Sequence, residues 1–269
     1  MSINFPLFLV LATLVTGLIW LFDNLVLRPR RRAAAALLES QAGAASEAIE
    51  QAQQAVLKEP VVVEYAISFF PVLFAVLILR SFLIEPFQIP TGSMIPTLLV
   101  GDFIVVNKYA YGVRLPVIGT KIIDVDKPAN GDVMVFVPPH EDEYFIKRVI
   151  GIPGDTIRYE DKIVFINGVE QPQTFVARMP PDRPDYEVYA ETIGGVEHLI
   201  HRSPFPGNGP QEWVVPDGMY FMMGDNRDRS SDSRYWGMVA EEDIVGKAFA
   251  VWFHWDSGMP LFSRRGWIE

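Results

Sequence analysis

Two long apolar stretches lie near the amino terminus, and a polar segment separates them. Residues 5–22 read FPLFLVLATLVTGLIWLF, contain no charged residue, and reach about the 20 residues that a helix needs to cross the hydrocarbon core of a bilayer. Residues 61–84 form the second stretch, in which Glu64 and Arg80 lie near the ends, where long side chains can reach the interface. The pattern predicts transmembrane segments within residues 1–27 and 61–84.

Basic residues beside the first stretch predict the orientation. The run RPRRR at residues 28–32 should stay on the cytoplasmic side, so residues 28–60 are predicted to be a cytoplasmic linker, helical because it is rich in Ala, Glu and Gln. Everything after residue 84 is then periplasmic or outside. A cleaved secretory signal is the alternative, but the flank MSIN has no Lys or Arg. We expect a multi-pass protein of the inner (cytoplasmic) membrane.

From residue 100 onward, short β-branched and aromatic runs alternate with Pro, Gly, Asn and Asp. Runs such as GDVMVFVPP and KIVFINGV, bounded by turn residues, are typical of strands. Their number predicts a curled antiparallel sheet or barrel. Residues 172–212 are richer in Pro, Gly and charge and are predicted to be an insertion of extended hairpins. The expected fold is therefore a mainly β exported domain, residues 85–269, anchored by two N-terminal transmembrane helices.

Composition removes several classes of function. A net charge of −10, from 33 acidic and 23 basic residues, argues against nucleic-acid binding as the main task. The absence of cysteine removes thiol nucleophiles, disulfides and thiolate metal sites. No histidine lies in an HExxH motif, and the pair His198 and His201 has no obvious third ligand. We expect no cofactor and no metal, and the oligomeric state is left open.

The segment PTGSM, residues 90–94, places a hydroxyl on a stiff loop. Pro90 and Pro96 restrict the backbone around Ser93, Gly92 permits close approach of a substrate, and Thr91 adds a second hydroxyl. A serine nucleophile needs a base and donors for the oxyanion. The alternative is an ordinary turn with a solvated serine.

The segment EYFIKRVIGIPGD, residues 143–155, contains a candidate base. If it is a strand, Lys147 shares a face with Phe145 and Val149 and lies among apolar neighbours. A lysine base at pH 7 to 8 needs a pKa lowered by about three units, which costs roughly 4 kcal/mol and requires burial. The alternative is a lysine on a solvated strand edge.

The segment GDNRDRSSDSRYWG, residues 224–237, is too polar for a strand. Asp232 and Arg234 can pair and hold the loop, and Ser230 can hydrogen-bond a neutral lysine amine and orient it. The alternative is a charged surface loop.

In this order and at these separations, the three segments resemble bacterial signal peptidase I, also called leader peptidase, across essentially the whole chain. The resemblance implies a serine endopeptidase that removes signal peptides from exported preproteins, cutting after small-x-small sites. It implies Ser93 as nucleophile and Lys147 as general base, with the hydroxyl of Thr91 and the N–H of Ser93 as the oxyanion hole. Ser230, Asp232 and Arg234 match supporting residues. The commonest form has serine at position 91, so the added methyl group of threonine restricts this donor.

The resemblance also implies shallow apolar pockets for small substrate side chains. Their expected lining is Phe87, Ile89, Pro90 and Ile146. The expected partners are preproteins and membrane lipid, and the C-terminal aromatics Trp252, Phe253, Trp255 and Trp267 either meet the membrane interface or fill a core.

Two other functions compete with this one. The first is a membrane-tethered β module that binds partners without protease activity. The second is a self-cleaving Ser/Lys protease joined to a DNA-binding domain, which the two predicted spans and the acidic charge oppose.

Overall fold

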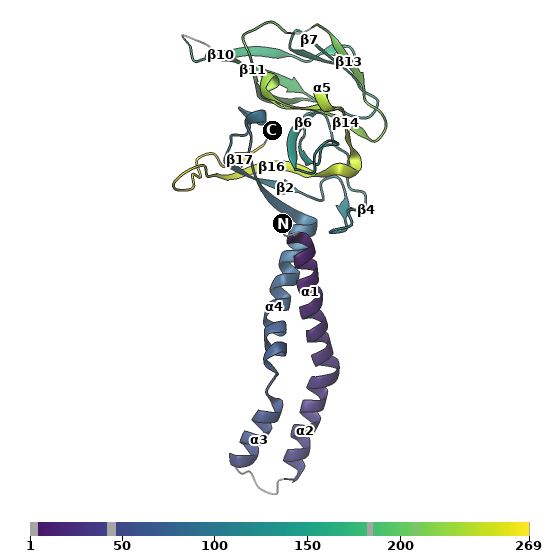
Figure 1. The fold of residues 1–269 in the computed structure, drawn as a ribbon, viewed down its shortest axis with the longest axis vertical. Helices are drawn as coiled ribbons and strands as arrows, with labels where there is room; N and C mark the ends of the chain where they lie inside the picture. Colours follow the sequence, from purple (N-terminus) through teal and green to yellow (C-terminus); the bar gives the residue numbers. More distant parts are fainter. Residues whose placement is uncertain (1–4, 42–46, 182–184, 208, 269) are drawn as a thin grey trace. The chain divides into compact units, whose positions relative to one another are not determined.

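A computed structural model describes residues 5–41, 47–181, 185–207 and 209–268 (Figure 1). The chain divides into two compact units, Met1–Ser81 and Phe82–Glu269. The first is helical and the second is built mainly of strands.

The helices of the first unit cover both apolar stretches and much of the segment between them. They are α1 (Phe5–Phe22), α2 (Arg28–Gln41), α3 (Glu47–Leu57) and α4 (Val61–Ile78), with π-helical turns at Asp23–Leu27 and Leu79–Leu83. Two helical stretches, Phe5–Glu39 and Val61–Leu83, are long and apolar enough to cross a membrane, and only 11% of the apolar window of each is buried. Side chains that protein does not cover are suited to lipid, so both helices fit membrane anchoring.

Helices α1 and α4 pack against each other through aromatic side chains. Trp20 stacks on Phe70 with ring centroids 5.4 Å apart, and a Cβ at Gly17 would lie 2.8 Å from the Phe70 ring. Beyond α1, the buried carboxylate of Asp23 accepts two hydrogen bonds from Arg31, at 2.6 and 3.1 Å. Residues 28–41 and 47–57 of the linker are helical, as their composition predicts, and this ion pair stabilises the first of these helices. The predicted linker residues 42–46 lie outside the described part of the chain.

The largest sheet of the second unit is eight-stranded and antiparallel. Its strands are β1 (Ile84–Gln88), β2 (Asp102–Asn107), β5 (Val133–Phe136), β6 (Phe145–Gly151), β14 (Met219–Met223), β15 (Val239–Ala240), β16 (Ile244–His254) and β17 (Gly266–Trp267). Their order is β1-β2-β16-β5-β6-β14-β15, with β17 also paired to β16. Register shifts interrupt the pairing of β16 with both β2 and β5, and such bulges bend a strand. The prediction of a mainly β, curled antiparallel fold is confirmed.

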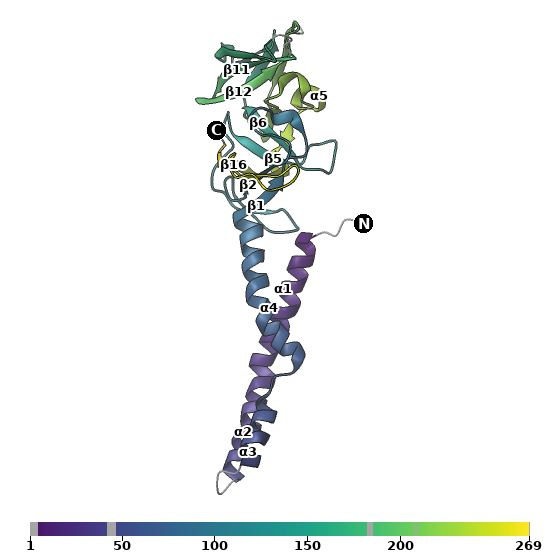
Figure 2. The same ribbon diagram turned by 90° about the vertical axis from the view of Figure 1, so that its left-hand side faces the viewer.

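Three smaller sheets complete the second unit. A three-stranded sheet holds β10 (Gln173–Met179), β11 (Tyr186–Ile193) and β12 (Val196–Arg202); a four-stranded sheet holds β7 (Thr156–Glu160), β8 (Ile163–Ile166), β9 (Val169–Glu170) and β13 (Gln211–Val214); and β3 (Val113–Arg114) pairs with β4 (Lys121–Ile123). Strand β11 lies beside β12 (Figure 2). The segment predicted as extended hairpins thus forms β10 to β12, whereas β13, at its end, pairs with β7 instead.

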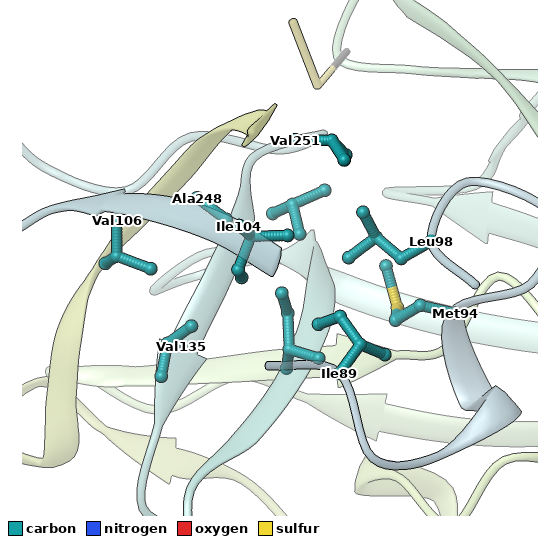
Figure 3. Packing of buried hydrophobic residues seen from close by; sticks show 10 residues of the cluster. Ile89, Met94, Leu98, Ile104, Val106, Val135, Ala248 and Val251 are labelled. Carbon is teal, nitrogen blue, oxygen red and sulfur yellow. The ribbon is translucent and has the colours of Figure 1, made fainter. Parts of the chain in front are cut away.

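A hydrophobic cluster supports the loop that follows β1. Ile89, Met94 and Leu98 of this loop are at most 1% exposed and pack with Ile104 of β2 and Val251 of β16 (Figure 3). The loop contains a short 3-10 turn, Gly92–Met94. Because its apolar side chains point into the core, the backbone around Ser93 rests on a packed base.

The C-terminal aromatic residues divide between packing and exposure. Phe253 stacks on Phe103 with ring centroids 4.4 Å apart, whereas Trp252, Trp255 and Trp267 are 57%, 48% and 79% exposed. Phe253 is therefore partly buried by aromatic stacking, whereas the three tryptophans remain largely exposed.

Candidate active site

Ser93 and Lys147 meet in a buried position. Lys147 Nζ donates hydrogen bonds to Ser93 Oγ at 2.7 Å and to the Ile146 carbonyl at 3.1 Å. Ser93 is 9% exposed and Lys147 only 3%. Strand β6, which carries Lys147, lies between β5 and β14, so it is an interior strand whose residues are buried on both faces.

The surroundings of Lys147 favour its neutral form. Burial lowers the pKa of Lys147 to about 8, against a smaller opposing effect of the carboxylates of Asp232 and Asp225. No carboxylate in the described part of the chain forms an ion pair with its ammonium group. A buried amine with a pKa near the working pH can accept a proton.

Another buried lysine gives a contrast within the same unit. Lys162 Nζ donates to Ser203 Oγ at 2.6 Å, much as Lys147 does to Ser93. However, Lys162 Nζ also lies 3.0 Å from a carboxylate oxygen of Asp228. Lys162 therefore has a direct carboxylate partner, which Lys147 lacks among the described residues.

Thr91 and Asn226 lie beside the serine. Thr91 Oγ1 is 3.5 Å from Ser93 Oγ, and the Thr91 residue is exposed. Asn226 donates its backbone N–H to the Ser93 carbonyl at 3.0 Å and its side-chain amide to the Gly92 carbonyl at 2.9 Å. These two hydrogen bonds join the segment 90–94 to the segment 224–237. Asn226 lies within the segment 224–237, but no sequence pattern distinguishes it from its polar neighbours.

Asp232 and Arg234 form the predicted pair. Arg234 donates from Nε and Nη2 to the two carboxylate oxygens of Asp232, at 2.7 and 2.8 Å. Asp232 also accepts from the backbone N–H of Gly224 at 3.1 Å, and Arg234 donates to the Arg227 carbonyl at 2.6 Å. The pair therefore ties both ends of the polar loop to one point.

Ser230 differs from its prediction. Its buried Oγ has no hydrogen-bond partner within the described residues, so the expected contact with the Lys147 amine is absent. It nevertheless lies at the site, because a Cβ built on Gly224 would be 2.3 Å from Ser230 Oγ and 2.4 Å from the Ser93 carbonyl oxygen. Lys147 instead directs hydrogen bonds to Ser93 and to its own neighbour in the strand.

Buried ion pairs surround this centre, and sequence reasoning missed them. Arg148 donates to both carboxylate oxygens of Asp225, at 3.0 and 2.9 Å, and both side chains are fully buried. Burial would raise the pKa of Asp225, but Arg148 holds it below its usual value. Arg227 binds Glu191 of β11, with one contact of 2.8 Å. An arginine within the buried apolar strand FIKRVIG was the available signal, because a buried charge requires a partner of opposite sign.

The four predicted pocket residues differ in exposure. Phe87 is half-buried and packs edge-on against Tyr144, with centroids 5.2 Å apart, while Pro90 is exposed. Ile89 and Ile146 are only 1% and 8% exposed and belong to the core cluster. Strand β1 pairs only with β2 in the described part of the chain, so its other edge is open.

Comparison with known proteins identifies the family. Residues 62–255 match the profile described as signal peptidase, peptidase S26. The chain belongs to this family. It is 51% identical to the signal peptidase I of Pseudomonas fluorescens and 50% identical to that of Pseudomonas aeruginosa, with 100% of each chain covered in both cases. The signal peptidase I of Haemophilus influenzae is 36% identical over 93% of this chain and 85% of its own.

A solved structure of another signal peptidase I, from Enterococcus faecalis V583, is 28% identical. It matches 46% of this chain and 98% of its own length, with a TM-score of 0.29. Family membership in the signal peptidases therefore rests on the sequence relatives.

Proposed function

We propose that this protein removes signal peptides from exported preproteins, with Ser93 as the nucleophile and Lys147 as the general base. The observation that carries the proposal is the 2.7 Å contact between Lys147 Nζ and Ser93 Oγ, in a site where burial lowers the pKa of the lysine to about 8. The relatives named signal peptidase I support the substrate class.

In the proposed mechanism, the neutral amine of Lys147 takes the proton from Ser93 Oγ as this oxygen attacks the scissile carbonyl. The N–H of Ser93 and the hydroxyl of Thr91 donate to the oxyanion. Lys147 then gives its proton to the leaving amine, and an acyl-enzyme on Ser93 is left. Lys147 activates the water that hydrolyses the acyl-enzyme and regenerates the serine.

The polar loop is proposed to support this chemistry without touching the scissile bond. The Asp232–Arg234 pair fixes the loop, because Asp232 also holds the N–H of Gly224 at 3.1 Å. A buried hydroxyl without a hydrogen bond destabilises the folded state by about 1–3 kcal/mol, so a hydrogen bond gained by Ser230 Oγ during the reaction would be favourable. We propose that it hydrogen-bonds the Lys147 amine once Ser93 has been acylated.

The substrate is proposed to lie along the open edge of β1 as an added strand. Phe87 and Pro90 then offer surface to the peptide, while Ile89 and Ile146 form the floor. A floor whose residues are 1% and 8% exposed leaves room only for shallow pockets, which suit small side chains. This accounts for cleavage after small-x-small sites.

The proposed location is the inner membrane, with the linker 28–60 in the cytoplasm and the catalytic unit on the periplasmic side. The basic run at residues 28–32 supports this orientation. The exposed Trp252, Trp255 and Trp267 are proposed to meet the lipid interface, where tryptophan is enriched.

Cleavage of a purified preprotein by the full-length protein in detergent tests the proposal. We expect the wild type to cut after a small-x-small site, and Ser93→Ala and Lys147→Ala to bind the preprotein without cutting it. Ser203→Ala is the matched control, since this serine also touches a buried lysine, and it should cut normally. Retained cleavage by both site variants would contradict the Ser93–Lys147 pair. Binding without cleavage by the wild type would instead favour a β binding module.

A further inference from the structure

The β3–β4 hairpin carries a group of apolar side chains that nothing in the described unit covers. We name this group the hairpin patch: it consists of Leu115, Val117 and Ile118 in the turn between the two strands. All three are exposed, and Ile118 reaches 74%. Exposed apolar residues that cluster in this way mark interaction surfaces, whereas isolated ones are ordinary.

The exposed side chains of the hairpin patch lie on a turn that backbone hydrogen bonds hold in place. Leu115 donates its N–H to the Thr120 carbonyl at 2.9 Å, and Gly119 donates to the Leu115 carbonyl at 3.0 Å. Val117 has a φ of 69°, in the left-handed region that β-branched residues rarely adopt. The turn therefore holds Val117 and Ile118 outward although neither backbone sterics nor burial favours this arrangement.

Charged side chains flank the turn and attach the hairpin to the rest of the unit. Arg114 and Lys121 pair in the register next to the turn. Lys121 Nζ lies 2.6 Å from a carboxylate oxygen of Glu241 and 2.7 Å from one of Asp124, and Arg114 donates to the Glu241 carbonyl at 2.7 Å. At the base, a Cβ on Gly112 would lie 2.7 Å from the Ile123 carbonyl oxygen, so the two strands approach closely there. The hairpin is thus a supported element whose apolar turn lies beyond a charged pair.

The hairpin begins close to the end of the second membrane-spanning candidate. Leu83 is the last residue of that helix, and its carbonyl accepts the N–H of Lys108 at 3.0 Å. Val113 follows Lys108 by five residues, which span at most about 18 Å when extended. Tyr109, between them, is 43% exposed, and tyrosine is common at the lipid interface. A bilayer that holds this helix is therefore within reach of the hairpin.

We infer that the hairpin patch inserts into the lipid bilayer and forms a membrane contact separate from the two helices and from the C-terminal tryptophans. We choose lipid as the occupant because a helix long enough to span a membrane ends at Leu83, and the carbonyl of Leu83 is hydrogen-bonded to Lys108. Apolar side chains on an amphipathic element enter the interface, while the charged side chains beside them, here Arg114 and Lys121, remain with the polar groups.

Lipid quenching of a fluorescent label tests this inference without any measurement of cleavage. The chain has no cysteine, so Ile118→Cys introduces one labelling site in the full-length protein. The labelled protein is reconstituted into vesicles of phosphatidylethanolamine and phosphatidylglycerol, some of which carry a nitroxide on the acyl chain. The matched control is Val169→Cys, at the turn of another hairpin, β8–β9, where Val169 is 64% exposed.

We expect the nitroxide lipids to quench the label at position 118 about threefold or more above the label at position 169. Adding Val117→Asp to the Ile118→Cys protein should reduce that quenching, because a carboxylate resists entry into lipid. Equal quenching at the two positions would overturn the inference. The inference would also be overturned if the label at position 118 became shielded from solvent in detergent as the protein concentration rose, because a second copy of the chain would then occupy the patch.

Discussion

Lys147 Nζ lies 2.7 Å from Ser93 Oγ, although the two residues are 54 positions apart in the chain. The contact depends on the interior position of β6 and on the loop after β1, whose Ile89 and Met94 are buried in the core. Tertiary packing therefore creates the pair, and it also removes the water that would otherwise stabilise the ammonium group.

The first prediction concerns the pH dependence of cleavage. Because the reaction needs the neutral amine, and burial lowers the pKa of Lys147 to about 8, kcat/KM should rise with pH through a midpoint near 8 and then level off. Preprotein cleavage measured from about pH 6 to 10 gives this midpoint. A midpoint at the value of an ordinary lysine would show that the base is not buried Lys147.

The second prediction concerns stability. The pKa of Lys147 is about 8 in the folded protein, against 10.5 for an ordinary lysine, so between these values the unfolded chain binds more protons and the free energy of unfolding rises with pH. Below pH 8 the buried lysine costs up to about 3 kcal/mol. Lys147→Met, which keeps the length of the side chain, should therefore raise the melting temperature in detergent at pH 7 and much less at pH 10. A lower melting temperature at pH 7 would contradict this.

The third prediction concerns the oxyanion donor. Thr91→Val keeps the shape of the side chain but removes the hydroxyl, and should lower kcat by about 10² to 10³ with less effect on KM. Thr91→Ser is the control and should retain most of the activity, because it preserves the hydroxyl. Steady-state kinetics on one preprotein give both constants, and an unchanged kcat for the valine variant would remove Thr91 from the oxyanion hole.

The fourth prediction compares a fully buried ion pair with a partly exposed one. Asp225→Asn removes the carboxylate charge that faces the fully buried Arg148 and should lower the free energy of unfolding by about 3–5 kcal/mol. Glu187→Gln removes the partner of Arg178, which is 61% exposed, and should change it by less than about 1 kcal/mol. Thermal unfolding of the two variants side by side measures the difference. Equal effects would show that Asp225 does not hold the buried charge.

The fifth prediction concerns the space between the two active-site segments. The added methyl group of Gly224→Ala would meet Ser230 Oγ at 2.3 Å and the Ser93 carbonyl oxygen at 2.4 Å, so it must displace the serine loop. We expect kcat to fall about tenfold or more, because small displacements of reacting groups slow catalysis strongly. Gly209→Ala is the control, since nothing lies within 4 Å of a Cβ there, and its kcat should not change.

The sequence predicted the elements that depend on local patterns. The two apolar stretches, the many short strands and the extended hairpins could be predicted because the spacing of apolar residues reflects burial, and Pro, Gly, Asn and Asp mark turns. Alternation in the Lys147 strand placed that residue among apolar neighbours, and it is 3% exposed.

Contacts between segments that are distant in the chain could not be predicted from the sequence. Arg148 and Asp225 are 77 positions apart, and Arg227 and Glu191 are 36 apart, so no local pattern pairs them. Charged side chains are usually solvated, and only the three-dimensional packing shows that these are buried. The missing hydrogen bond of Ser230 belongs to the same class, because it depends on the placement of one hydroxyl among several donors.

The second lysine–serine contact, between Lys162 and Ser203, affects how such enzymes are recognised from coordinates. A template that asks only for an amine within hydrogen-bonding range of a hydroxyl would return both pairs, and the Lys162 contact is the shorter, at 2.6 Å against 2.7 Å. The useful criterion is a direct ion pair: Asp228 pairs with Lys162, while no carboxylate in the described segments pairs with Lys147. In this chain, the lack of a direct carboxylate partner distinguishes the potential base from the structural lysine better than proximity to a hydroxyl does.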